Sequence, residues 1–231
     1  MADALAYLRA NRNRRPVFAV SQTLTQMDGV WRSHRQWTGV GTDIVAVETV
    51  MWREQLLSTE GEIPSIEERN AAVIEGRVAH TRLTSHRTGG RERSKRLSLP
   101  HPAVTPASLP LFMAQNWQAL IGGERLPACY LILKMPWATA VSIGRRDAAQ
   151  PGRVSIAVTP SNAILRVLFG AAVYEFDADA PRLHRIDGVL DPRDRKSLGG
   201  WREYLGSVEF ETPLDLKPLT RDAISSDRDG F

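Results

Sequence analysis

Short stretches rich in β-branched and aromatic residues alternate with turn sequences along most of this 231-residue chain. Residues 17–27 read VFAVSQTLTQM, Asp28-Gly29 follows as a hairpin turn, and VWRSHRQW then resumes the strand pattern. Such stretches predict roughly nine to eleven strands, and their tight connections favour antiparallel neighbours. The dominant pattern therefore indicates a mainly β protein built on an antiparallel sheet.

Helical patterns are few. SLPLFMAQNWQALIGG, at 108–123, is the strongest, with Ser108 as a cap and two glycines at its end, and SNAILRVLFG is a shorter one. We also expect a short N-terminal helix at 1–12. Residues 58–77 have little periodicity and are predicted as a loop with a short helix from Ser65, where a Ser-x-x-Glu capping box follows a proline.

A sheet of this many strands has to curl to bury one face. Two or three short helices have the right length to cover or plug the concave side. We therefore predict a strongly curved antiparallel sheet or incomplete β-barrel rather than a flat sandwich, formed by residues 1–212 as a single domain, with a flexible tail at 213–231.

The hairpin YEFDADAPRLHRIDGVLDP places a histidine among apolar residues. If Asp179 begins the turn, the two-residue period puts His184 on the same face as Tyr174, Phe176 and Ile186. Two interpretations stay open: a hydrogen-bonded core histidine near the turn, or a polar group lining a ligand cavity and exchanging a proton near neutral pH. The charged run that follows, from Asp191 to Lys196, is predicted as a solvated loop.

Glu48 stands inside the apolar strand DIVAVETVMW, on the same face as Trp52. An unpaired buried carboxylate needs a partner or a raised pKa. Glu48 is therefore either one half of a salt bridge at a sheet edge or a candidate acid or base. In the second case, it would act with His184 across a cavity.

Six tryptophans are many for a chain of this size, and several fall at the ends of predicted elements. Such rings suit the rim of a cavity for an apolar ligand with a polar end, and they equally suit a core or a dimer face. Candidate ligand-binding residues are Tyr174, Phe176, Ile186, Trp52 and Trp117, and a homodimer is a possible assembly.

Several classes of function find no support in the sequence. It has no apolar run long enough for a membrane helix, no phosphate-binding glycine pattern and no nucleophile elbow. His80 and His86 are too far apart on a strand to share a metal ion, so we expect neither a metal nor a cofactor. The net charge of +4 comes partly from a basic hairpin between Arg82 and Arg96, which lacks interleaved aromatics, so nucleic-acid binding is not expected.

Two runs of sequence resemble a known architecture. LPLFMAQNWQALIGGERLPACYLIL and VSIAVTPSNAILRVLFGAAVYEFDADAPRLHRIDGVLDPRD resemble uncharacterised bacterial proteins related to the LolA and LppX lipoprotein carriers. The segment FDADAPRLHRIDGVLDP is similar to part of VioE, a violacein-pathway protein that shares this half-barrel fold. The resemblance implies a half-barrel with an apolar cavity, and VioE indicates that such a fold can direct a biosynthetic rearrangement.

These observations lead to two main hypotheses, and a third, binding of nucleic acid or another anion by the hairpin between Arg82 and Arg96, ranks below them. The first is a binding protein for an apolar small molecule or lipid-like ligand held in the concave face. The second is a cofactor-independent cyclase or isomerase that uses acid-base residues in the same cavity. The start of the chain lacks the order of a signal peptide, so we expect a cytoplasmic protein, or a periplasmic one if a leader has been removed.

Overall fold

The computed structural model describes residues 1–9, 13–39, 41–85, 89–147, 150–195 and 201–219. The first eight strands are β1 (Ala2–Leu8), β2 (Pro16–Met27), β3 (Val30–Thr38), β4 (Ile44–Trp52), β5 (Leu56–Ile63), β6 (Glu68–Glu75), β7 (Val78–Thr84) and β8 (Arg93–Ser98). The others are β9 (Ala103–Val104), β10 (Arg125–Ile132), β11 (Trp137–Arg146), β12 (Arg153–Pro160), β13 (Ala172–Asp177), β14 (Arg182–Arg195) and β15 (Trp201–Asp215). The helices of the described residues are α1 (Leu109–Gln115), α2 (Trp117–Ile121) and α3 (Ala163–Phe169), with 3-10 turns η1 (Pro64–Ile66) and η3 (Lys217–Leu219).

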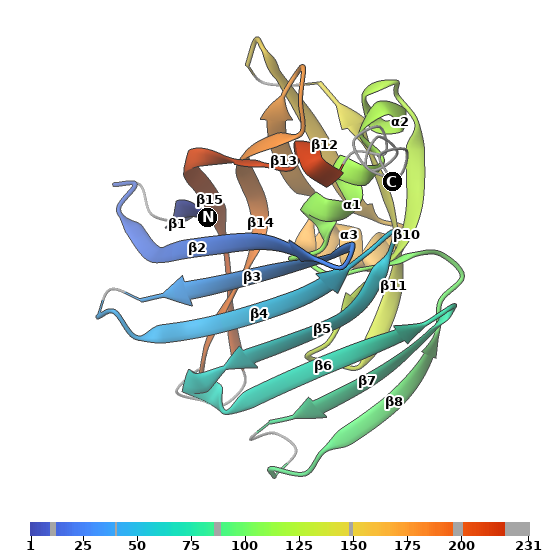
Figure 1. Cartoon of the computed structure of the whole chain (residues 1–231). Helices are drawn as coiled ribbons and strands as arrows, with labels where there is room; N and C mark the ends of the chain where they lie inside the picture. The colour runs from blue at the N-terminus through green and yellow to red at the C-terminus, as the bar shows by residue number, and fades with distance from the viewer. Residues whose placement is uncertain (10–12, 40, 86–88, 148–149, 196–200, 220–231) are drawn as a thin grey trace.

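All fifteen strands belong to one open sheet in the order β8-β7-β6-β5-β4-β3-β2-β1-β15-β14-β13-β12-β11-β10-β9. Neighbours are antiparallel except β9, which runs parallel to β10. In Figure 1, β2 to β8 run across the picture, while β10, β11 and β14 run more nearly from top to bottom. The predicted mainly β, antiparallel class is confirmed, although the sheet has more strands than expected.

The N-terminal segment is a strand, so the expected helix at 1–12 is wrong for the residues described, and residues 10–12 lie outside them. Ala2, Ala4 and Ala6 are buried on one face of β1, which pairs with β2 on one side and β15 on the other. Alanine favours helices in isolation, but two strands that pair with this segment outweigh that preference. The strand joins the two ends of the described chain in one sheet.

Two further expectations need correction. The segment predicted as a loop at 58–77 forms strands β5 and β6 around η1, and Ser65 starts no α-helix. The predicted flexible tail begins too early, because β15 continues to Asp215 and Leu214, Leu216 and Leu219 are buried. Residues 220–231 of that tail lie outside the described residues.

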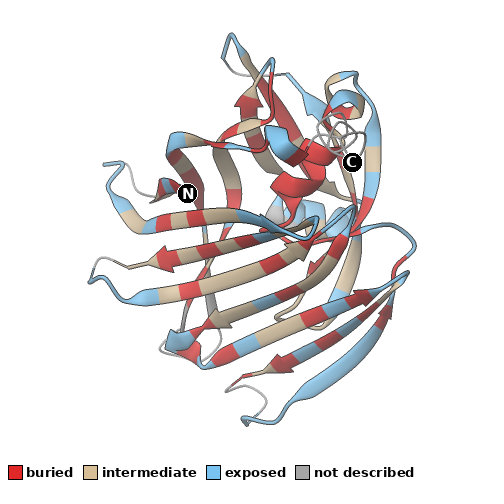
Figure 2. Cartoon of the chain, viewed as in Figure 1, coloured by how far each residue is buried: buried red, intermediate tan, exposed pale blue. Residues whose placement is uncertain are grey.

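The predicted helix at 108–123 forms as two short helices that break at Asn116, whose φ of −107° and ψ of 26° interrupt the helical path. Every residue of α1 is buried, as expected for a helix that is apolar on all sides. The ring of Trp52 in β4 packs edge-on against Phe112 at 6.4 Å, and Phe176 in β13 packs against Trp117 at 5.4 Å. The helix pair thus lies against β4 and β13, and it is buried in the middle of the molecule (Figure 2).

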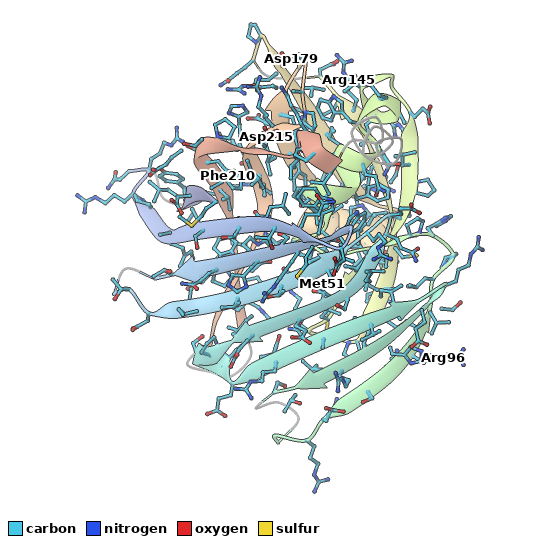
Figure 3. The ribbon with its side chains drawn as sticks, in the orientation of Figure 1. Met51, Arg96, Arg145, Asp179, Phe210 and Asp215 are labelled. Atoms are coloured by element: carbon cyan, nitrogen blue, oxygen red, sulfur yellow. The ribbon has the colours of Figure 1, made fainter. Side chains whose placement is uncertain are left out.

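The basic hairpin predicted around 82–96 forms the outer edge of the sheet. Four residues of β8 are exposed, namely Arg93, Ser94, Lys95 and Arg96, and Arg96 is labelled beside this edge strand in Figure 3. Charged side chains on an edge strand discourage pairing with a second chain.

Candidate functional site

Side chains from distant parts of the sheet line a partly open cavity of about 260 Å³. One wall comes from β3 to β6, and the other comes from β10 to β15 and α3. Apolar residues make up most of the lining, including Ala46, Leu109, Val141, Val158, Leu165 and Leu190. The cavity is therefore an apolar chamber between two parts of one sheet.

A buried ion cluster lies in this chamber. Arg35 of β3 is paired across the strands with Glu48 of β4, and its Nη2 donates to Glu48 Oε2 at 3.1 Å. The same nitrogen donates to Asp191 Oδ2 of β14 at 2.5 Å. Since β3 and β14 lie four places apart in the sheet order, the sheet bends far enough between them for their side chains to meet.

The second oxygen of Glu48 is held by two hydroxyls. Thr105 donates to Glu48 Oε1 at 2.8 Å and Thr59 donates to it at 3.3 Å. Burial raises the pKa of Glu48, the Arg35 charge opposes that rise, and Asp191 adds to it, so the pKa lies above its ordinary value. Glu48 is thus a carboxyl group that holds its proton more strongly than an exposed one.

Arg35 balances this cluster. Burial by itself would lower the pKa of Arg35, but the charges of Asp191 and Glu48 more than offset that effect and raise it. The guanidinium carbon also lies 5.6 Å from the centre of the Trp37 ring, a cation–π geometry. The arginine therefore remains a cation in an otherwise apolar wall.

Two tyrosines line the chamber beside the cluster. Burial raises the pKa of both Tyr130 and Tyr174, and the charges of Asp191 and Glu48 add to that rise. Within the described part of the chain, neither hydroxyl forms a hydrogen bond. Both phenols are consequently neutral donors that no described residue engages.

A second polar region borders the same chamber. Arg193 of β14 forms an ion pair with Glu68 of β6, both nearly inaccessible to solvent, and Lys134 pairs with Glu203 of β15. Burial and the nearby Arg193 charge lower the pKa of Lys134 to about 8. The three cations of the lining, Arg35, Lys134 and Arg193, are therefore each matched by a carboxylate.

The structure brings together part of the predicted site. Glu48, Tyr174 and Ile186 line the chamber. Phe176, Trp52 and Trp117 do not; they are buried in the core against the helices, where the Trp52 indole nitrogen donates to Gln115 at 3.2 Å. These three side chains are better explained by packing than by ligand contact.

His184 is not where the two-residue period puts it. β14 has a bulge between Leu183 and Arg185, so Phe176 pairs with Leu183 and the histidine leaves the apolar face. Its Nε2 lies 2.9 Å from Asp177 Oδ1, and Asp177 also pairs with Arg153 and Arg182. Burial and the charge of Arg153 lower the pKa of His184. Since it does not line the chamber, the expected Glu48–His184 pair does not form there.

Comparison with known proteins adds little to this geometry. No protein-family model matches the chain, and the search of curated proteins finds no relative. Among solved structures, the chain is similar to a β-barrel-like protein of Domain of Unknown Function DUF1849 from Brucella abortus. That match has a TM-score of 0.46 and 11% sequence identity, and it covers 93% of this chain and 94% of the other.

The sequence reasoning missed Arg35, Asp191, Tyr130 and Lys134. The position of Arg35 was predictable, because the Asp28-Gly29 hairpin and the two-residue period put it on the same face as Trp37, beside the strand of Glu48. The predicted solvated loop is wrong at Asp191, because β14 continues through this residue to Arg195 past a second bulge. Its contact with Arg35 joins residues 156 positions apart, which no local pattern reports.

Neither a metal centre nor a membrane-spanning helix is found in the parts of the chain that are described. No group of three metal-ligating side chains is assembled there, and no helix there combines the length and apolar character needed to cross a bilayer.

Proposed function

We propose that this protein is a half-barrel that binds an apolar small molecule or lipid-like ligand in the chamber between β3–β6 and β10–β15. The observation that carries the proposal is the chamber itself: about 260 Å³, mostly apolar, with a few polar groups gathered at the Arg35 cluster. Apolar walls with a small number of placed polar groups are typical of small-molecule sites. The sequence resemblance to lipoprotein carriers points to the same kind of ligand.

Exposed apolar side chains near the chamber support a route of entry. Met135 and Trp137 line it and are 49% and 42% exposed. In α3, Leu165 lines the chamber while Ile164 and Val167 are exposed. A ligand that enters here would meet apolar surface before it reaches the interior.

The test is direct binding of a neutral apolar probe. Native mass spectrometry of freshly purified protein should reveal a co-purified molecule that is lost on denaturation, and Nile red should bind saturably with a rise in fluorescence. Ala172→Phe, which fills the chamber from β13, should abolish Nile red binding. Ala157→Phe is the matched control, because Ala157 lies on the neighbouring strand β12 outside the lining. Equal binding by both variants would overturn the proposal.

Glu48 supports a second candidate, a cofactor-independent cyclase or isomerase. Its raised pKa and its position near two phenols suit an acid that donates a proton to a substrate in this chamber. The two candidate functions are distinguished by analysing the ligand that is released from the Glu48→Gln variant and from the unsubstituted protein. A binding protein releases its ligand unchanged from either form, whereas an enzyme returns a rearranged product only from the unsubstituted chain.

A further inference from the structure

The polar groups of the chamber are arranged in a way that restricts the ligand. Each cation of the lining is already engaged: Arg35 by Glu48 and Asp191, Arg193 by Glu68, and Lys134 by Glu203. An anionic headgroup that enters would find none of these three without a carboxylate partner. It would have to displace a protein carboxylate to gain a counter-charge.

The cluster around Arg35 is itself formally negative. One guanidinium faces two carboxylates, which sum to a formal charge of −1 when both are ionised. The side chains of Arg35, Glu48 and Asp191 are 5%, 13% and 22% exposed, so water screens this charge only in part. An anion placed beside it is repelled as well as desolvated.

Neutral hydrogen-bond donors are available at the same place. Tyr130 and Tyr174 line the chamber, and neither hydroxyl has a hydrogen-bond partner among the described residues. A phenol donates well to a carbonyl, ester or alcohol oxygen and needs no counter-charge to do so. The chamber therefore offers a polar end that is suited to an uncharged oxygen.

We infer that the ligand is an uncharged amphiphile, an apolar chain or ring that ends in a hydroxyl or carbonyl oxygen held by Tyr130 and Tyr174, and that fatty-acid anions and phosphates are rejected. This inference rests on the proposed binding function and names the ligand class for the same chamber. The pairing of all three cations and the two free phenols carry it together.

The first experiment compares matched ligands by displacement of Nile red at pH 7, where decanoate is ionised and Lys134, with a pKa of about 8, is mostly protonated. 1-Decanol should displace the dye at a concentration at least about tenfold below that of decanoate, because the charge of decanoate has no free partner in the chamber. The double variant Tyr130→Phe with Tyr174→Phe should weaken 1-decanol at least about fivefold. Tyr7→Phe is the control, since Tyr7 does not line the chamber and instead lies under Arg14.

A second experiment reverses the preference. Asp191→Asn brings the Arg35 cluster from a formal charge of −1 to zero, and Glu203→Gln leaves Lys134 without its carboxylate partner. Each should raise the affinity for decanoate relative to that for 1-decanol at least about fivefold. The two substitutions are independent, so one remains informative if the other impairs folding.

The outcomes separate the two proposals. If decanoate binds the unsubstituted protein as tightly as 1-decanol, or if neither charge substitution changes its affinity, the inference about an uncharged ligand is overturned while the binding function stands. If neither Nile red nor any decyl ligand binds, both proposals fail.

Discussion

Arg35 supplies the positive charge that lets two carboxylates lie together in an apolar wall. Its side chain is 5% exposed, it contacts both Glu48 and Asp191, and it lies on the ring of Trp37. Removing one member of a buried ionic group is costly because the remaining charges lose their partner. The two carboxylates depend on Arg35 more than Arg35 depends on either of them.

The first prediction follows from that asymmetry. Arg35→Gln should lower the free energy of unfolding at pH 7 by about 3–5 kcal/mol, because it leaves two adjacent buried carboxylates. Glu48→Gln should cost less than about 1.5 kcal/mol, since Arg35 keeps Asp191 and the amide can still accept from Thr105. Urea denaturation measures both, and equal losses for the two variants would contradict this account.

The pH dependence gives a second prediction. Because the folded pKa of Glu48 lies above its ordinary value of 4.5, the folded chain binds this proton more tightly than the unfolded chain does. Stability from this group is therefore present below pH 4.5 and is lost as pH rises through the folded pKa. Between these values the free energy of unfolding should rise more steeply with pH in Glu48→Gln than in the unsubstituted protein. Parallel curves across that window would argue against a raised pKa.

Glu48 and His184 show what a residue pattern can and cannot predict. The face of Glu48 follows from strict alternation along an uninterrupted strand, so its burial and need for a partner were predictable. The face of His184 depends on one extra residue in β14, and a bulge of that kind reverses the alternation without a clear sequence signal. Two-residue alternation therefore predicts the face of Glu48 on β4 correctly and that of His184 on β14 wrongly.

Among the elements, β1 and β15 approach each other closely at one glycine. Gly206 of β15 pairs with Leu8 of β1, and a Cβ atom at Gly206 would run into the carbonyl oxygen of Tyr7. A backbone atom cannot move aside as a flexible side chain can. Glycine at this position is required by the neighbouring strand.

The third prediction tests this close approach. Gly206→Ala should lower the free energy of unfolding by at least about 3 kcal/mol, because the strands must separate to admit the methyl group. Gly188→Ala is the matched control: Gly188 pairs with Gly206 from β14, and its added Cβ would lie 3.3 Å from the Cβ of Ala172. The control should cost less than about 1 kcal/mol by thermal or urea denaturation. A similar cost for the two glycines would show that β1 is not packed this closely.

Element prediction failed where the inner face of the sheet is polar. The hairpin of β2 and β3 was predictable from a clear turn and apolar alternation. In β5 and β6, the positions that face inward include Thr59, Gly61, Glu68 and Asn70, so the alternation of apolar and polar residues is missing. A strand whose inward side chains are polar is hard to distinguish from a loop until its partners are known.

At the scale of the whole molecule, ion pairs connect the two walls of the chamber. Arg35 and Asp191 are 156 positions apart in the chain, and Glu68 and Arg193 are 125 apart. Both pairs join the strands before α1 to β14. The separation of the walls is therefore fixed by electrostatic contacts as well as by the sheet itself.

The fourth prediction measures one of these connections. In a double-mutant cycle of Glu68→Gln and Arg193→Gln, the coupling energy should be about 1–3 kcal/mol, because both side chains are almost fully buried. Glu62 and Arg69 form the control pair, with side chains 45% and 76% exposed, and should couple by less than about 0.5 kcal/mol. A buried pair that couples no more strongly than the exposed one would mean that the walls are held by the sheet alone.

The strands of this sheet are connected in the order of a ring. Every neighbouring pair is consecutive in the chain except β1 with β15, and the outermost strands, β8 and β9, are themselves joined by an exposed turn at Pro100 and His101. A circular permutant that begins at His101, ends at Pro100 and links the present ends would turn the one long-range pairing into a hairpin. Folding slows as contacting residues lie farther apart in sequence, so the permutant should reach the same sheet faster than the natural chain, which cannot complete its sheet until β15 reaches β1.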